Sequence, residues 1–97
     1  MLGNKSPQVK GLYTIEYLQK VSSHDIPLLP KSVKIDIKQA IEERLTTNPI
    51  DFGKPLRYSL KGARRLRVGD YRVIYQIQGT MVIISAIKHR KDVYENA

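Results

Sequence analysis

The chain has 97 residues, the length of one domain, and its 41% hydrophobic and 27% charged residues are typical of a folded, soluble protein. Its 17 basic and 9 acidic side chains give a formal charge of +8, which favours an anionic partner such as nucleic acid. The lack of cysteine excludes disulfides and thiolate metal sites and suits a reducing cytoplasm, and the longest apolar run is far shorter than the ~20 residues of a membrane helix.

The chain begins with a segment that predicts little regular structure, followed by a strand. Residues 1–11 are polar and poorly patterned, so we expect a flexible leader within a single domain spanning 1–97. Residues 12–18 are rich in β-branched and aromatic side chains and predict a first strand. Two serines at 22–23 predict a short helical turn, which Pro27 limits to a few residues.

Residues 31–47 predict the one long helix. Apolar side chains recur there every four residues, at Val33, Ile37, Ile41 and Leu45. We expect Ser32 to cap this helix and Asn48-Pro49 to end it, because the residue before a proline avoids the α region. Residues 49–62 contain several prolines and glycines, so they predict a loop with a partial strand near 56–60.

The second half of the chain predicts three consecutive strands. Residues 64–68 and 71–78 alternate with a period of two and are joined by Gly69-Asp70, a short turn between antiparallel strands. Residues 81–88 are apolar on both faces, which indicates a central strand covered on both sides. We expect the tail after residue 88 to leave the sheet and turn helical. The predicted order is β-α-α-β-β-β, an α+β fold with an antiparallel sheet packed against one long and one short helix.

Positive charge is concentrated in this second half. Residues 49–97 hold 10 basic and 4 acidic side chains, against 7 and 5 in residues 1–48. Within the hairpin, Leu66 and Val68 fall on one side of the extended chain and Arg65 and Arg67 on the other. Arginine is the side chain best suited to phosphate, so this strand face predicts an anion-binding surface.

Two motifs in this order resemble the RelE/ParE superfamily of type II toxin–antitoxin toxins. They are LKG followed by RLRVGDYRVIYQI at 60–77, and KHRKDVY at 88–94, which favours the RelE-like branch. The resemblance covers about residues 12–94. It implies a fold similar to the microbial ribonucleases and a toxin held inactive by a cognate antitoxin.

The resemblance also implies an activity. RelE-type members are metal-independent endoribonucleases that cleave mRNA in the ribosomal A site and thereby inhibit translation, so the expected partners are the antitoxin, the 70S ribosome and mRNA in the bacterial cytoplasm. No cofactor and no membrane partner are expected. A metal site is not expected either, because His24 and His89 are far apart and no cysteine accompanies them. Two alternatives remain, a ParE-like inhibitor of DNA gyrase and a decayed toxin that only binds its antitoxin.

The same resemblance assigns candidate site residues, and the expected catalytic set is Arg72, Arg65, His89, Arg90 and Tyr94. Arg72 matches an arginine at the scissile phosphate, although an exposed strand residue paired with Asp70 or Glu16 is the alternative. His89 is suited to proton transfer, whereas Tyr94 is expected either to stack on a base or to cover the sheet edge. The expected RNA-binding set is Arg67, Arg64, Lys61, Lys88 and Lys91.

Overall fold

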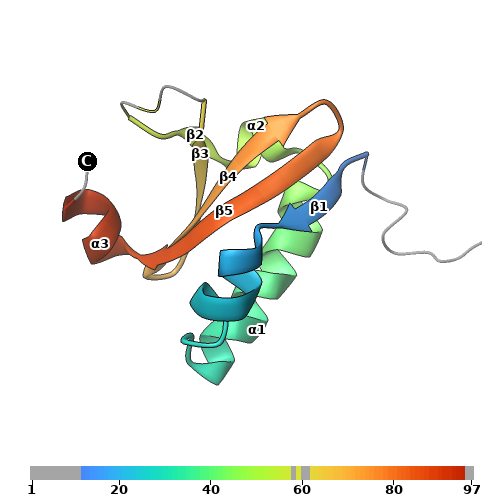
Figure 1. The fold of residues 1–97 in the computed structure, drawn as a ribbon. Helices are drawn as coiled ribbons and strands as arrows, with labels where there is room; N and C mark the ends of the chain where they lie inside the picture. The colour runs from blue at the N-terminus through green and yellow to red at the C-terminus, as the bar shows by residue number, and fades with distance from the viewer. Residues whose placement is uncertain (1–11, 58, 60–61, 96–97) are drawn as a thin grey trace, which may run out of the picture.

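The computed structural model describes residues 12–57, 59 and 62–95, and Figure 1 shows a five-stranded sheet with its helical layer on one face. The strands are β1 (Thr14–Tyr17), β2 (Lys54–Pro55), β3 (Arg64–Val68), β4 (Tyr71–Gln78) and β5 (Met81–His89). Their spatial order is β1-β5-β4-β3-β2. The three long strands β3 to β5 are antiparallel neighbours, as predicted, while β1 adds a parallel edge strand beside β5.

The helical layer is continuous along most of its length. The π-helical turn η2 (Val21–Asp25) precedes α1 (Lys31–Ala40), and η3 (Ile41–Leu45) continues α1 with one π-helical turn. This confirms the predicted short and long helices. The predicted cap was wrong, since the helix begins after Pro30 and Ser32 lies inside its first turn without a capping hydrogen bond.

The segment after the long helix differs from the predicted loop. Asn48 caps a short helix, α2 (Pro49–Phe52), by accepting a hydrogen bond from the Asp51 amide. Proline is well tolerated at the first helical position because its missing N–H would have no partner there. The partial strand expected near 56–60 lies earlier, at β2, and parts of the expected range fall outside the described residues. The tail forms α3 (Arg90–Glu95), as expected.

The core lies between the helical layer and one face of the sheet. It contains Ile37, Ile41 and Leu45 from the helix, and Leu66, Val73, Tyr75, Val82, Ile84 and Ile87 from the strands. The remaining edge of β5 is covered by η2, because the Asp25 carboxylate accepts a hydrogen bond from the Ile87 amide at 3.0 Å. The long helix packs on this face, and the opposite face of β3 and β4 carries charged side chains.

A β-bulge interrupts the pairing of β4 with β5. Ile74 pairs with Ala86, but the next pair is Tyr75 with Ile84, so Ser85 is an extra residue on β5. Its hydroxyl donates to the Ile74 carbonyl at 3.2 Å. An extra residue reverses which side chains of β5 point to which face beyond that point.

Candidate nucleic-acid interface

Basic side chains from four strands meet on the sheet face opposite the long helix. Residues directly opposite in a sheet share a face, and the register pairs Arg67 with Arg72, Arg72 with Lys88, and Arg65 with Lys54. We call this surface the basic face, defined by Lys54, Arg65, Arg67, Arg72 and Lys88. The predicted alternation of the hairpin is confirmed, since Leu66 packs in the core while Arg65 and Arg67 face away from it.

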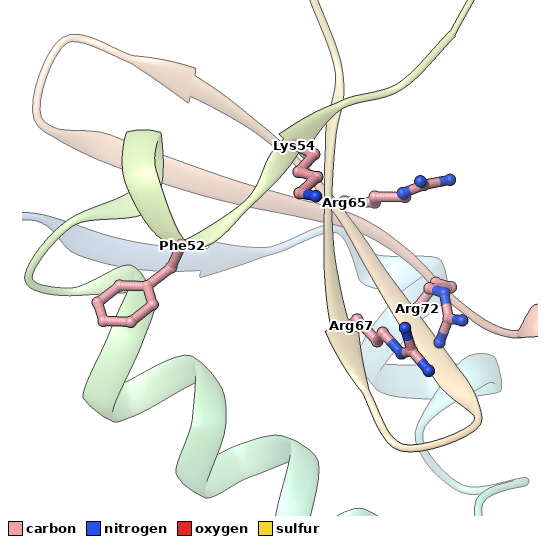
Figure 2. A pocket seen from close by; sticks show the side chains of 5 residues that line it. All are labelled: Phe52, Lys54, Arg65, Arg67 and Arg72. Atoms are coloured by element: carbon pink, nitrogen blue, oxygen red, sulfur yellow. The ribbon is translucent and has the colours of Figure 1, made fainter.

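A pocket of about 130 Å³ opens on the basic face. We call it the cation pocket; its lining residues are Phe52, Lys54, Arg65, Arg67 and Arg72. Figure 2 shows the guanidinium groups of the three arginines on one side of β3, with Lys54 reaching toward Arg65 from β2. Among the described lining residues, four side chains are cationic and none is acidic, so this lining attracts anions and repels metal cations.

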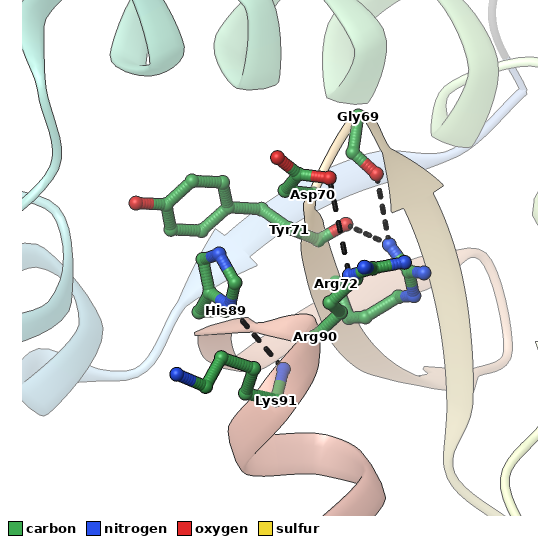
Figure 3. A network of polar contacts seen from close by, with 7 residues as sticks. All are labelled: Gly69, Asp70, Tyr71, Arg72, His89, Arg90 and Lys91. Carbon is green, nitrogen blue, oxygen red and sulfur yellow. Dashed lines mark hydrogen bonds and ion pairs between the residues drawn. The ribbon is translucent and has the colours of Figure 1, made fainter.

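Arg72 lines this pocket and is only 2% exposed, so the alternative of an exposed strand residue is wrong. Its Nη1 donates to the carbonyls of Gly69 at 3.0 Å and Tyr71 at 2.9 Å, which ties the guanidinium to the hairpin turn (Figure 3). A side chain held in this way is preorganised, because little rotamer freedom remains to be lost when an anion binds.

The cation pocket has the chemistry of a phosphate site. Arginine remains protonated in proteins and its planar donors match phosphate oxygens. Arg65 is half-buried and Arg67 is exposed, so both side chains remain within reach of a ligand. Fixed cations of this kind stabilise the charge that develops on a phosphoryl group in a transition state. The described lining holds no histidine or carboxylate, so it supplies charge and orientation.

His89 lies on the other face of the sheet. It pairs with Tyr71, and the two rings meet edge to face with centroids 5.3 Å apart. Its Nδ1 accepts a hydrogen bond from the Lys91 amide at 3.2 Å (Figure 3). The structure therefore does not bring His89 to the cation pocket. It brings the preceding Lys88 to the basic face instead, opposite Arg72.

The remaining candidates from the tail sit on α3. The Arg90 amide donates to the Asp70 carbonyl at 2.7 Å, which docks the start of α3 on the hairpin turn. The Arg90 side chain lies 4.0 Å from the Asp70 carboxylate, a weak contact between two exposed groups. Lys91 is exposed, whereas the Tyr94 side chain lies outside what the structure describes.

Two candidates of the RNA-binding set remain, Lys61 and Arg64. Lys61 lies outside the described residues, whereas Arg64 is the first residue of β3. Arg64 pairs with the buried Tyr75, so it points to the core side and not to the basic face. Its Nη2 donates to the carbonyls of Ile50 at 2.6 Å and Gly53 at 3.0 Å. The structure thus separates Arg64 from the predicted RNA-binding set.

Sequence reasoning missed Phe52 and Lys54. Both lie in the segment predicted as a loop, where no periodic pattern placed them on a face. The pairing of Lys54 with Arg65 was the missing information, because it depends on where β2 meets β3. The only local signal was the Asn48-Pro49 pair, which fits a capped helix start as well as a helix end.

A second hollow, of about 320 Å³, lies on the helical side of the molecule. We call it the apolar groove; its lining is Tyr17, Ile26, Leu29, Lys34, Ile37, Lys38, Ile41, Glu42 and Ile87. Burial, together with the nearby Glu42 carboxylate, raises the pKa of Tyr17. No helix in the described part of the chain is long and apolar enough to cross a membrane.

Comparisons with known proteins point to one group. The family model described as the ParE toxin of the type II toxin–antitoxin system parDE matches residues 16–94. Toxin RelG of Mycobacterium tuberculosis is 32% identical over 84 residues, which cover 84% of this chain and 95% of RelG. Toxin RelE of the same organism is 38% identical over 56 residues, which cover 58% of each chain.

Solved structures show the same fold. The RelBE2 toxin–antitoxin complex from Mycobacterium tuberculosis contains a chain that is 31% identical, with a TM-score of 0.73 and coverage of 80% of this chain and 91% of that one. A mutant of E. coli toxin RelE in the free state is 22% identical, with a TM-score of 0.63 and coverage of 88% and 93%. The latter likeness concerns the fold alone.

Proposed function

Because this chain belongs to the ParE toxin family of type II toxin–antitoxin systems, within the RelE/ParE superfamily, we propose that it inhibits translation as a ribosome-dependent endoribonuclease. The proposed substrate is mRNA in the ribosomal A site, which places the protein in the cytoplasm. The similarity to toxins RelG and RelE supports the RelE-like activity over other toxic mechanisms.

The observation that carries this proposal is the cation pocket, in which Lys54, Arg65 and Arg67 surround the buried Arg72. In RNA cleavage by the 2′-hydroxyl, the hydroxyl loses its proton and a bond forms between phosphorus and the 2′-oxygen. The bond from phosphorus to the 5′-oxygen breaks, and that oxygen takes up a proton. Negative charge accumulates on the phosphoryl oxygens during this exchange. Preorganised arginines stabilise that charge without a metal ion, which the positive pocket would repel.

A cognate antitoxin is the proposed protein partner. RelBE2 of Mycobacterium tuberculosis and RelB-RelE of Methanococcus jannaschii are both described as toxin–antitoxin complexes. In this chain the apolar groove offers Leu29, Ile37 and Ile41 to the apolar face of a partner helix, while acidic residues of the same antitoxin would be attracted to the basic face.

The direct test is cleavage of mRNA on programmed ribosomes by the purified chain and two variants. Arg67→Ala removes an exposed cation of the cation pocket, and we expect cleavage about 10²-fold slower. Lys31→Ala, on the exposed start of α1, removes the same charge elsewhere and should leave the rate unchanged. Equal rates for all three proteins would refute the assignment of the site.

The alternative is inhibition of DNA gyrase, which the match to the ParE toxin model favours. Transcript mapping after induction in cells separates the two functions. Discrete, codon-linked cuts support the endoribonuclease, whereas intact transcripts with induction of the DNA-damage response support gyrase poisoning. Absence of both growth arrest and cleavage would indicate a toxin that retains only antitoxin binding.

A further inference from the structure

Two polar side chains from the core side of the hairpin hold the α2 turn. Arg64 Nη2 donates to the carbonyls of Ile50 and Gly53, at 2.6 and 3.0 Å. Tyr75, directly across from Arg64, donates its hydroxyl proton to the carbonyl of Pro49. The first and last residues of the Pro49–Gly53 segment are therefore bonded to β3 and β4, which fixes the position of this segment on the sheet.

The approach is so close that only glycine fits at position 53. Gly53 is buried, and a Cβ atom added there would lie 1.7 Å from the Tyr75 hydroxyl oxygen and 3.0 Å from the Arg65 carbonyl. Its φ of −107° is open to any residue, so the constraint is space and not backbone conformation. The turn cannot shift toward the sheet, and the Arg64 hydrogen bonds prevent it from moving away.

Position 54 follows directly from this anchored glycine. Lys54 pairs with Arg65 in a strand of only two residues, which has few ladder hydrogen bonds of its own to stabilise it. Two successive residues of β3 therefore contact two successive residues of the turn. On the core side, Arg64 donates a hydrogen bond to the Gly53 carbonyl. On the basic face, Arg65 lies beside Lys54.

We propose that Lys54 is a phosphate-binding residue of the cation pocket and that Arg64 is the positioning residue that places it there. Lysine is a compact charge on a flexible stem, so it requires a fixed backbone to bind at a defined point. Arg64 acts through Gly53 and β2 and does not itself contact the ligand. This inference rests on the proposed phosphate-binding role of the cation pocket, but it does not require that RNA be cleaved.

A double-mutant cycle on the full chain tests this coupling, with inorganic tripolyphosphate as the probe and calorimetry as the measurement. We expect Lys54→Met to weaken binding about tenfold, because one charged contact is lost. Arg64→Met should weaken it by a similar factor. The double variant should bind no more weakly than either single variant, since Arg64 acts only through Lys54.

Three further variants separate positioning from a general effect. Arg64→Lys retains one donor for the Ile50 or Gly53 carbonyl and should recover part of the affinity, whereas Lys31→Met, with the same loss of charge on α1, should bind as the wild type does. If Arg64→Met does not fold, Tyr75→Phe loosens the same turn by removing only the hydroxyl, and its effect should likewise vanish in a Lys54→Met background.

The outcomes distinguish this inference from the proposed function. Multiplicative losses in the double variant, unchanged affinity of Arg64→Met, or no binding of tripolyphosphate by the wild type would each overturn the inference. A chain that shows the coupled losses but leaves mRNA intact would support the inference and refute the endoribonuclease. If the chain cleaves mRNA but the double variant shows multiplicative losses, the endoribonuclease is supported and the coupling between Arg64 and Lys54 is refuted.

Discussion

Arg67 and Arg72 lie directly opposite each other on β3 and β4, yet they differ sharply in exposure. Arg67 is exposed, while Arg72 is 2% exposed and bonded to the hairpin turn. Two like charges side by side repel, so the pair is costly for folding and favourable for binding an anion that neutralises both. The difference in exposure and bonding predicts that removal of Arg67 leaves the fold intact, whereas removal of Arg72 destabilises it.

Alanine substitutions should therefore separate stability from toxicity at these two positions. We expect Arg72→Ala to lower the free energy of unfolding by about 2–3 kcal/mol, because its charged hydrogen bonds to the Gly69 and Tyr71 carbonyls are lost. Arg67→Ala should change it by less than about 0.5 kcal/mol while relieving growth arrest. Urea unfolding and growth after induction measure the two effects, and a destabilised Arg67→Ala would contradict the prediction.

Gly53→Ala should destabilise the protein by about 1–3 kcal/mol, since the new methyl group collides with the Tyr75 ring. Adding Tyr75→Phe should recover part of this loss, because the nearest colliding atom is the hydroxyl oxygen. Gly79→Ala is the matched control. There the residue has a φ of +60° and open space, so any cost arises from the backbone and Tyr75→Phe should not reduce it. Thermal unfolding of Gly53→Ala and Gly79→Ala, each with and without Tyr75→Phe, measures these effects. Equal effects of Tyr75→Phe in the two backgrounds would contradict the prediction.

Tyr75 should make the protein sensitive to alkaline pH. Burial raises the pKa of the Tyr75 phenol above its ordinary value of 10.0, although the Arg64 charge partly opposes this rise. The unfolded chain then loses this proton first, so the contribution of the neutral phenol is complete below pH 10 and is lost as the pH rises through the folded-state pKa. Tyr75→Phe should cost about 1 kcal/mol at pH 7.

The difference in unfolding free energy between wild type and Tyr75→Phe should narrow above pH 10. Urea unfolding at pH 8, 9, 10 and 11 provides the comparison. All other titratable groups are common to the two proteins, so their effects cancel in the difference. A constant difference across this range would show that Tyr75 does not titrate in the folded state as expected.

Asp25 should contribute more to the stability of the fold than its position in a polar turn implies. Asp25→Ala leaves the Ile87 amide without its carboxylate acceptor and should cost about 1–3 kcal/mol. Asp25→Asn retains a carbonyl oxygen and should recover part of this stability. Asp36→Ala, on the exposed face of α1, is the control and should have little effect. Faster hydrogen exchange at the Ile87 amide in Asp25→Ala would locate the loss at the edge of β5.

Local pattern was sufficient to predict most of the elements. The four-residue spacing from Val33 to Leu45 predicted the long helix, and the alternation of Leu66 with Arg65 and Arg67 predicted which face of β3 would carry charge. Both patterns are local consequences of helix and strand geometry, so they need no knowledge of distant residues. The alternation identified Arg65 and Arg67, and the family resemblance singled out Arg72. These are three of the four cations in the described pocket lining.

Only the tertiary structure decided which other side chains lie in the cation pocket beside the three arginines. Lys54 reaches the pocket because β2 pairs with β3, a contact that no spacing in the sequence encodes. His89 lies outside the pocket because the extra residue Ser85 reverses which side chains of β5 point to each face. Lys88 therefore lies beside Arg72, and His89 lies beside Tyr71. Sequence periodicity determines alternation within an unbroken strand, whereas a bulge and a strand register are set by pairing with another part of the chain.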